Sequence, residues 1–540
     1  MADGPGLSAV LLLVAGEGLP PAAEMADRIL PAATGGGGLA GLFHEVAYRS
    51  GQLPAITTPN GAWSYTRLLA AAQTVAAALR SEPAFHPGAR VVLLLANSAE
   101  YAAAFYGVLL AGGVVVPLPP RTEASGLQAI LDSTDAVVAI ATGPVVRQQA
   151  ALHLIPAKVV NLAQPPVEES QLADAPCTRS GAELAAIFFT AGSTGTPKGV
   201  MLSHDNLSSN AQSIQEYLRI DAGERPLCVL PFYHAFGNSV LQSHLLAGAH
   251  LIIDGQTAFP ETIIASLARH QATSLSGVPD LFRVLLDRTS LGVTPLPALR
   301  YMAVAGGSLR HELSLEVARR IEPGEFVVMY GQTEATARLA YVPPDHLSQV
   351  PAGSIGRAIP GVTLEVVDEQ GIPLPTGQVG ELRARGPGIM LGYWRDAAGT
   401  TDRLREGWLY TGDLASIDAE GWISHCGRRN ALVKIAGFRV HPADLEDFAV
   451  RRLAARQAVA VPFEAPDLGT RLALYLAPVA TGGLGLSEML ARCRAELPRH
   501  LVPDFIRIVD EFPLNHAMKI DRPELTRLAE SDVQRRRASA

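Results

Sequence analysis

The sequence predicts an α/β fold with a large N-terminal part of mostly parallel α/β sheets, a β-rich stretch, and a small C-terminal α+β part. The first observation is that apolar runs of strand length alternate with helical stretches after residue 38. The second is that short strands and Gly/Pro turns dominate from about residue 353. The third is size, because 540 residues, 48% of them hydrophobic, correspond to roughly two to four domains. A disordered chain and a disulfide-held mini-protein are therefore excluded.

Residues 1–38 are expected to form a loosely attached leader, because the glycine run at 35–38 is a flexible joint. The apolar run at 7–16 resembles a signal-peptide core, but Asp3 stands where such a peptide carries basic residues. A short helix, a strand or a partly disordered extension is expected there instead. No uninterrupted apolar run of roughly 18 residues predicts a membrane span.

The first sheet elements are expected between residues 91 and 118. An apolar strand at 91–96 is followed by an Ala-rich helix at 99–111 and a second apolar strand at 114–118. This order is typical of a parallel pair with a helical crossover.

Four apolar runs in the middle of the chain each end in small, polar or ionisable residues. The run at 184–190 is followed by AGSTG, 227–231 by FYH, 301–305 by GGS, and 326–330 by GQTE. Any single case is explained by the turn-forming preference of such residues. Because ligands bind at the carboxyl ends of strands in open α/β sheets, the four together predict one composite site.

The later elements follow from shorter patterns. Alternation at 362–367 and 379–384 predicts strands of a β-rich subdomain at about 353–427. A change of texture at 427–430 marks the main domain boundary. The chain beyond it is expected to be α+β, with a helix near 442–456 and a strand near 472–476.

Charge and cysteine patterns exclude several functions. The net charge of −8 is spread along the chain, so no basic face indicates nucleic-acid binding. The 14 histidines show no spacing typical of a transition-metal site. The four cysteines are far apart and form no CxxC pair, which favours a reducing, cytoplasmic location.

Lysine is scarce in this chain. Only four of the 44 basic residues are lysines, at positions 158, 198, 434 and 519, and the rest are arginines. GC-biased coding accounts for the replacement wherever a generic positive charge suffices. We hypothesise that the remaining lysines mark positions where a planar guanidinium cannot replace a compact ammonium.

The segment TAGSTGTPKG at 190–199 has the composition of a phosphate-binding loop. Its glycines allow close backbone approach, and successive N–H groups with Lys198 suit a polyphosphate. Gly199 follows Lys198 where a Walker A loop requires Ser or Thr, so a P-loop phosphotransferase is disfavoured. The alternative is that the segment is a Gly/Ser linker. The segment is short and directly follows a predicted strand, and both facts argue against a linker.

This segment resembles the signature of the adenylate-forming superfamily, which contains acyl-CoA synthetases, nonribosomal-peptide adenylation domains and luciferases. Six further matches follow in the family's order: LPFYHAFG (230–237), AGGSL (305–309), YGQTEA (330–335), WLYTGD (408–413), GRRNALVKIAGFRVHPADLE (427–446) and PLNHAMKIDR (513–522). The resemblance covers residues 40 to 528. It implies an ATP- and acid-binding domain at 39–427, a hinge at 428–430 and a mobile C-terminal lid domain at 431–540.

The resemblance implies an ATP-dependent carboxylic acid ligase. The acid attacks the α-phosphate of ATP to give acyl-adenylate and pyrophosphate, and a CoA or carrier-protein phosphopantetheine thiol then takes the acyl group and releases AMP. ATP, Mg²⁺ and CoA or phosphopantetheine are the implied cofactors. The alternative is an amide ligase in which an amine or amino acid captures the adenylate. A non-catalytic nucleotide-binding homologue is a third, remote possibility.

The resemblance also assigns roles to residues. Lys519 would bridge the acid carboxylate and the α-phosphate, Lys434 would enter for the second step, and Glu334 beside Thr333 would ligate Mg²⁺. Tyr330 would stack near adenine, and Asp413 would accept the ribose hydroxyls. The residues expected at the nucleotide are Thr190, Ser193, Thr194, Gly195, Thr196, Lys198, Gly306, Gly307, Ser308, Tyr330, Gly331, Gln332, Thr333, Asp413 and Arg428.

The resemblance also implies a pocket for the acid, lined by a smaller set of residues. Gly237 stands where domains that adenylate amino acids carry an Asp for the substrate amine, so an uncharged acyl or aryl acid is expected. His234 either gates the pocket catalytically or is a structural histidine. The residues expected to line the pocket are His234, Phe236, Asn238, Val278, Ala305 and Gly331.

Three positions depart from the family pattern. Asn430 occupies the pivot, where Asp or Lys is usual, Met518 replaces the Gly before Lys519, and Ala191 replaces a Ser. Asn430 and Met518 bear on the efficiency and timing of domain alternation, or they are drift at permissive loop positions.

Overall fold

The computed structural model describes residues 9–14, 38–148, 157–161, 179–190, 197–254, 259–429, 433–435, 438–465, 469–478, 484–514 and 520–538. The chain divides into two compact units. The first comprises residues 1–365, 383–410 and 421–423, and the second comprises residues 366–382, 411–420 and 424–540. The second unit therefore takes up part of the predicted β-rich subdomain. The predicted hinge includes Asn430, which lies outside the described residues.

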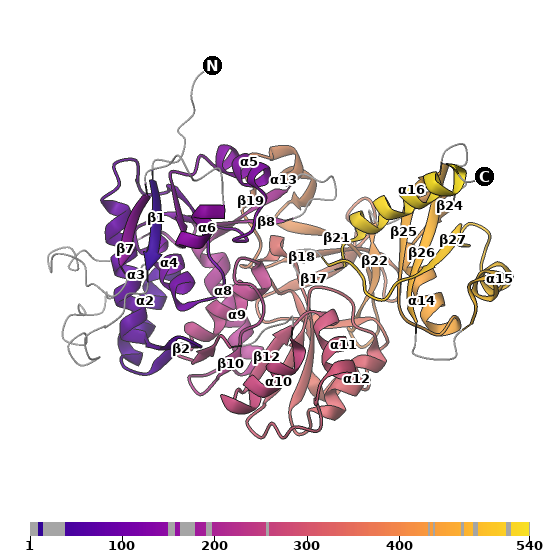
Figure 1. Ribbon diagram of the computed structural model, residues 1–540, viewed down its shortest axis with the longest axis horizontal. Coiled ribbons are helices and arrows are strands. Elements are labelled where there is room, and N and C mark those ends of the chain that lie inside the picture. Colours follow the sequence, from indigo (N-terminus) through magenta and orange to yellow (C-terminus); the bar gives the residue numbers. More distant parts are fainter. Residues whose placement is uncertain are drawn as a thin grey trace, which may run out of the picture. The chain divides into compact units, whose positions relative to one another are not determined.

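An eight-stranded sheet of the first unit runs in the order β19-β9-β8-β5-β4-β6-β1-β7. Figure 1 labels its strands β1, β7, β8 and β19. Neighbours from β8 to β7 pair in parallel, whereas β9 pairs antiparallel with both β8 and β19. The strands are β1 (Ala9–Val14), β4 (Arg90–Leu94), β5 (Val114–Pro117), β6 (Val138–Ala141), β7 (Ala157–Asn161), β8 (Leu184–Thr190), β9 (Lys198–Ser203) and β19 (Gly392–Tyr393). The predicted α/β class, and the strand–helix–strand order at 91–118, are confirmed.

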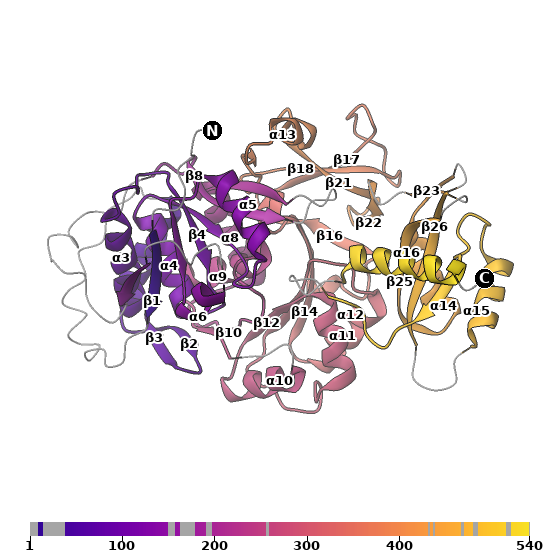
Figure 2. The ribbon, with the colours of Figure 1, turned by 45° about the horizontal axis from the view of Figure 1, so that its top comes forward.

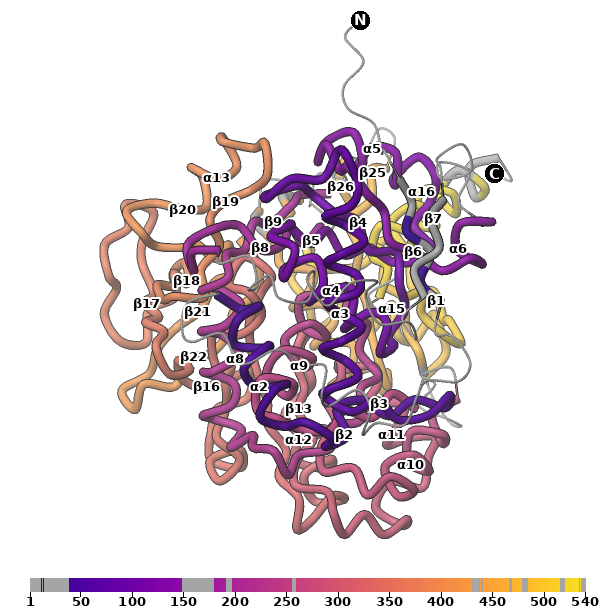
Figure 3. The backbone as a smooth tube through the Cα atoms, turned by 90° about the vertical axis from the view of Figure 1, so that its left-hand side faces the viewer, coloured from indigo at the N-terminus to yellow at the C-terminus, as the bar shows by residue number. Residues whose placement is uncertain are grey.

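The leader contributes a strand to this sheet. β1 lies between β6 and β7 and pairs in parallel with both (Figure 3). In this register Leu11 lies opposite Ile140 and Lys158. Leu11 and Leu13 are buried, as the apolar run requires. A strand was one of the three expectations for this run, and the rest of the leader lies outside the described residues.

A second sheet of the first unit contains the strands in the order β16-β15-β14-β13-β12-β10-β11-β2-β3. Strands β14 to β2 along this order are parallel, and the pairs β14–β15, β15–β16 and β2–β3 are antiparallel. The strands are β2 (Pro54–Thr58), β3 (Gly61–Ser64), β10 (Pro226–Leu227), β11 (Leu251–Ile252), β12 (Ser274–Gly277), β13 (Tyr301–Val304), β14 (Glu325–Tyr330), β15 (Ala340–Val342) and β16 (Ser354–Ala358). The run at 227–231 thus forms a shorter strand than predicted.

Helices cover both sheets of the first unit (Figures 1 and 2). The helix α4 is buried on nearly all its faces, and Ser98 caps its first turn by accepting from the Tyr101 N–H. The helices are α2 (Gly38–Ser50), α3 (Tyr65–Arg80), α4 (Ala99–Leu110), α5 (Ala124–Thr134), α6 (Gly143–Gln148), α8 (His204–Leu218), α9 (Ala235–Leu245), α10 (Pro260–Arg269), α11 (Pro279–Arg288), α12 (His311–Arg320), α13 (Ala397–Arg403) and the 3₁₀ turns η2 (Thr333–Ala335) and η3 (Pro344–His346).

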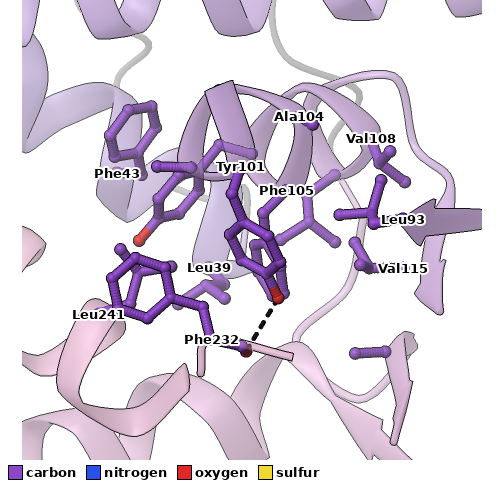
Figure 4. Packing of buried hydrophobic residues seen from close by; sticks show 14 of the residues in the cluster. Leu39, Phe43, Leu93, Tyr101, Ala104, Phe105, Val108, Val115, Phe232 and Leu241 are labelled. Atoms are coloured by element: carbon purple, nitrogen blue, oxygen red, sulfur yellow. Dashed lines mark hydrogen bonds between the residues drawn. The ribbon is translucent and has the colours of Figure 1, made fainter. Parts of the chain in front are cut away.

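The main core of the first unit is built around α4 (Figure 4). Tyr101 and Phe105 on this helix are fully buried, and the Tyr101 hydroxyl donates to the Phe232 carbonyl over 2.9 Å. Phe43 stacks on Tyr106 with ring centroids 3.7 Å apart. This packing fixes the backbone that leads into His234, two residues after Phe232.

The stretch from 353 is rich in short strands, as predicted. Its strands beyond β16 and β19 are β17 (Thr363–Val367), β18 (Gly380–Arg385), β20 (Leu404–Arg405), β21 (Trp408–Ile417) and β22 (Ile423–Arg428).

The C-terminal segment is α+β, as predicted. β25 pairs antiparallel with β26, which pairs in parallel with β27, while β23 and β24 form a separate hairpin. The predicted helix near 442–456 ends earlier, because Ala454 adopts a positive φ of 53° and turns the chain into β25. The elements are β23 (Val433–Ile435), β24 (Phe438–Val440), α14 (Pro442–Arg452), β25 (Ala455–Ala465), β26 (Gly469–Pro478), α15 (Leu486–Glu496), β27 (Phe505–Ile508) and α16 (Arg522–Ala538). Within the described part of the chain, no helix has the length and apolarity to cross a membrane.

Candidate active site

Three of the four polar strand ends lie along one edge of the second sheet. The strands β10, β12, β13 and β14 are parallel neighbours, with Leu275 opposite both Leu227 and Met302. The residues that follow them therefore share the carboxyl edge, where open α/β sheets bind ligands. The fourth end, at Thr190, belongs instead to the eight-stranded sheet.

The described ends of the phosphate-loop segment belong to the antiparallel strands β8 and β9. Thr190 and Lys198 pair across these strands, and the Thr190 hydroxyl donates to the Lys198 carbonyl over 3.4 Å. Both residues are half-buried. Ser193, Thr194, Gly195 and Thr196 lie outside the described residues, and their contacts to phosphate stay a prediction.

Lys198 is held by groups that the sequence did not reveal. Its Nζ lies 2.9 Å from Asp396 Oδ2 and 4.7 Å from the ring centroid of Tyr393. A hydrogen bond from the Gly399 N–H, together with one from Lys198, lowers the pKa of Asp396. Pairing of β9 with β19 brings Tyr393 and Asp396 here from nearly 200 residues away. The sequence signal for Asp396 is weak, because an Asp in this position indicates only a helix N-cap.

Glu334 lies on the turn η2 and is oriented by Tyr393. The Tyr393 hydroxyl donates to Glu334 Oε1 over 2.7 Å, and the Met390 N–H donates to the Glu334 carbonyl over 2.9 Å. Burial, followed by the charge of Glu334, raises the pKa of Tyr393, so the phenol stays a donor. Tyr393 thus lies between Lys198, which the resemblance assigns to phosphate, and Glu334, which it assigns to Mg²⁺.

The donor set around Glu334 fits a nucleotide-bound Mg²⁺. The described residues contain no group of three or more His, Cys, Asp or Glu side chains that could form a complete metal cage. Mg²⁺ usually takes one or two carboxylates and completes its shell with phosphate oxygens and water. A single oriented carboxylate beside a phosphate-type loop is therefore suitable for Mg²⁺ bound with ATP.

The predicted adenine-side residues cluster after β13 and β14. Gly306 adopts a φ of 87°, which favours glycine, at the turn directly after β13 and Ala305. A Cβ on Gly331 would lie 1.9 Å from the Ala337 carbonyl oxygen, so no larger residue fits there. Tyr330, Gly307, Ser308, Gln332 and Thr333 lie on the same two connections. Their roles toward adenine and phosphate remain predictions.

The predicted acid-pocket residues also lie at this edge. His234 precedes α9, its ring packs edge-on against Tyr233 with centroids 4.8 Å apart, and its carbonyl accepts from the Asn238 N–H over 2.8 Å. Asn238 is 1% exposed, and its side chain forms a hydrogen bond with the buried Tyr101 hydroxyl. Val278 and Ala305, which follow β12 and β13, are buried. The two interpretations of His234 stay open.

Steric crowding explains why position 237 is a glycine. A Cβ at this position would lie 2.1 Å from the Pro231 carbonyl oxygen, which is backbone. An amine-pairing Asp therefore does not fit in this fold of the segment, which is consistent with the predicted absence of an amino-acid substrate.

The predicted ribose ligand lies in the second unit. Asp413 is 2% exposed, and its Oδ1 lies 3.2 Å from Arg428 Nε and 3.5 Å from His425 Nε2. The predicted proximity of Arg428 to Asp413 is confirmed, and His425 was not anticipated. Lys434 is the central residue of β23 and pairs with Arg439. Lys519 and Asn430 lie outside the described residues.

Sequence reasoning missed one buried cation. Arg338 follows η2 by three residues and is 3% exposed, and its guanidinium carbon lies 4.0 Å from the ring centroid of Phe236. Nothing in the local sequence distinguishes it from the other arginines of the chain.

The chain is similar to several known proteins. A family model described as AMP-binding enzyme matches residues 43–394. A long-chain-fatty-acid–CoA ligase of Escherichia coli O6:H1 is 27% identical over 530 residues, which cover 90% of this chain and 94% of that protein. The crystal structure of ATP-bound MatB from Rhodopseudomonas palustris is 26% identical with a TM-score of 0.79, covering 92% of this chain and 99% of that one. The amide bond synthetase McbA from Marinactinospora thermotolerans has the same fold, with 23% identity, a TM-score of 0.79, and coverage of 91% and 100%.

Proposed function

The chain belongs to the AMP-binding enzymes of the adenylate-forming superfamily and is an AMP-forming acid ligase, and we propose that it joins a carboxylic acid to the thiol of CoA. In the first step a carboxylate oxygen bonds to the α-phosphorus of ATP, and the bond to pyrophosphate breaks. In the second step the thiolate bonds to the acyl carbon, and AMP leaves. The name of the Escherichia coli relative, a long-chain-fatty-acid–CoA ligase, supports CoA as the acceptor.

The observation that carries this proposal is the Lys198–Tyr393–Glu334 arrangement. It places a compact cation and an oriented carboxylate around one buried phenol, beside the strands whose described ends flank the phosphate-type loop. Ser193, Thr194, Thr196 and Lys198 hold the β- and γ-phosphates, and Thr190 and Gly195 complete the loop at the nucleotide. Glu334 holds Mg²⁺, which when bound neutralises phosphate charge. This arrangement of a cation and a metal-binding carboxylate suits a nucleoside triphosphate that releases pyrophosphate.

The remaining roles follow the family resemblance. Tyr330 with Gly306, Gly307 and Ser308 flanks the adenine, and Asp413 with Arg428 binds the ribose. Lys519 acts in adenylation and Lys434 in thioester formation, so that the C-terminal domain 431–540 alternates between the two steps about Asn430. An acyl carrier protein carries the same phosphopantetheine thiol and is therefore offered as a second acceptor.

Mass spectrometry of the products tests the proposal. The protein is incubated with ATP, Mg²⁺ and a panel of carboxylic acids, with CoA, a phosphopantetheinylated carrier protein, or amines offered separately. We expect acid-dependent pyrophosphate and AMP, with an acyl thioester of CoA. An amide in the amine arm without a thioester would replace the proposal with an amide ligase, and ADP instead of AMP would reject adenylation. Lys198→Ala serves as the inactive control, and Lys158→Ala, in β7, as the matched active one.

A further inference from the structure

Arg338 is a buried cation whose partners are all neutral. Its Nε donates to Met329 Sδ over 3.4 Å and its Nη1 to the Ala337 carbonyl over 3.4 Å, and the guanidinium covers the Phe236 ring. Burial lowers the pKa of Arg338, and a hydrogen bond with the Tyr217 hydroxyl acts in the opposite direction. Burial also raises the pKa of Tyr217 to about 12, so this phenol carries no balancing charge at neutral pH.

Two other sheltered charges of the first unit, Arg383 and Glu224, are paired. Arg383 donates to Glu365 Oε2 over 2.6 Å, and the buried Glu224 pairs with Arg300. Among the described residues no carboxylate pairs with Arg338. An unpaired buried charge is strongly unfavourable, and contact with an aromatic face compensates only part of that penalty. The site thus holds a positive charge without a counter-charge.

Arg338 lies beside the predicted acid pocket. A Cβ on Gly331 would lie 2.7 Å from the Arg338 Cα, and the ring beneath the guanidinium is Phe236. Both residues belong to the predicted pocket. Asn238, two residues after Phe236 on α9, adds a buried amide. The proposed ligase function assigns the phosphates and Mg²⁺ to Lys198 and Glu334, which Tyr393 joins, so the reacting carboxyl group is expected near them and not at Arg338.

We propose that Arg338 binds a second carboxylate at the remote end of the substrate, so that the preferred acid is a dicarboxylic acid activated at only one carboxyl group. This inference rests on the proposed ligase function. A planar guanidinium binds a carboxylate through two parallel N–H donors, a geometry that a neutral acyl end cannot match. The remote carboxylate supplies the missing charge and undergoes no covalent change. The expectation of an uncharged acid rested on Gly237, which concerns only the amine position.

The test compares matched acids in ATP–pyrophosphate exchange. Hexanoate is paired with adipate, octanoate with suberate, and benzoate with terephthalate. We expect the wild-type protein to favour one diacid over its monoacid partner by at least about 100-fold in kcat/KM. Arg338→Met should remove this preference, mainly through a higher KM for the diacid, while the monoacid is retained or improved. Arg338→Lys should restore part of the preference, and the exposed Arg121→Met should change nothing.

Three outcomes would overturn the inference or its premise. Wild-type preference for monoacids throughout the panel rejects the role of Arg338 and leaves the ligase intact. Equal loss of activity toward both acids of a pair in a folded Arg338→Met protein identifies Arg338 as a structural cation. Absence of exchange with every acid of either series rejects the proposed function itself. If the variant does not fold, the wild-type preference alone decides.

Discussion

At the scale of single residues, motif spacing identified the charged groups but not what orients them. Lys198 and Glu334 follow from sequence patterns, because their neighbours form recognisable turns. Tyr393 and Asp396 do not, because their role arises only when β19 pairs with β9. Arg338 is the extreme case, because no linear pattern records that no carboxylate in the described part of the chain pairs with it.

Tyr393→Phe should weaken the use of Mg²⁺ by roughly 10- to 100-fold, as loss of a hydrogen bond to a metal-binding carboxylate commonly does. The reason is that Glu334 loses the donor that fixes Oε1. Initial rates measured against Mg²⁺ concentration check this, with Glu334→Gln as the more severe comparison. Unchanged magnesium dependence in both variants would show that Glu334 does not bind the metal.

At the scale of elements, alternation of apolar runs and helices correctly predicted the α/β class and the region from 91 to 118. The insertion of β1 between β6 and β7 was not predictable, because strand order depends on contacts distant in sequence. The early end of α14 was missed because Ala454, without the usual glycine signal, adopts a positive φ.

The packing of α3 on α4 depends on Gly107. A Cβ there would lie 2.6 Å from Val75 Cβ and 2.7 Å from the Ala72 carbonyl oxygen. Gly107→Ala should therefore lower the free energy of unfolding by about 1–3 kcal/mol. Gly41→Ala, in α2, meets nothing within 4 Å and should leave stability unchanged or raise it by about 0.5–1 kcal/mol. Denaturant titration compares the two, and equal effects would contradict the close packing of these helices.

At the scale of the whole molecule, two buried histidines link stability to pH. Burial first, and then the nearby Arg179, lowers the pKa of His204 to about 4, and burial lowers that of His244 to about 4. The unfolded chain binds protons at both near pH 6.5, so stability is full above that pH and falls as the pH drops toward 4. Each histidine contributes up to about 3 kcal/mol across this window.

Thermal unfolding between pH 7.5 and 5 measures this dependence. The midpoint should fall steadily below pH 6.5, and His204→Gln should flatten the slope even if it lowers the midpoint itself. His86→Gln, at an exposed position, should leave the slope unchanged. A midpoint independent of pH in the wild-type protein would contradict the buried neutral state of both histidines.

If the C-terminal domain alternates between the two steps, different variants should impair different half-reactions. Lys519→Ala should reduce adenylation by at least about 100-fold, since it removes a charge that stabilises the transition state. It should still transfer the acyl group from a supplied acyl-adenylate to CoA. Lys434→Ala should show the reverse, a slower second step with normal pyrophosphate release. Single-turnover measurements of each step check the pair, and equal loss of both steps in both variants would reject the division of roles.

Oxygen transfer tests the central claim, acid activation as an acyl-adenylate, most directly. The acid is labelled with ¹⁸O in its carboxyl group and incubated with ATP, Mg²⁺ and CoA. The masses of the products are then measured by mass spectrometry. Because a carboxylate oxygen attacks the α-phosphorus and later leaves with AMP, one ¹⁸O atom should appear in AMP and none in pyrophosphate. Label in inorganic phosphate together with ADP, or unlabelled AMP beside an acyl product, would contradict adenylation.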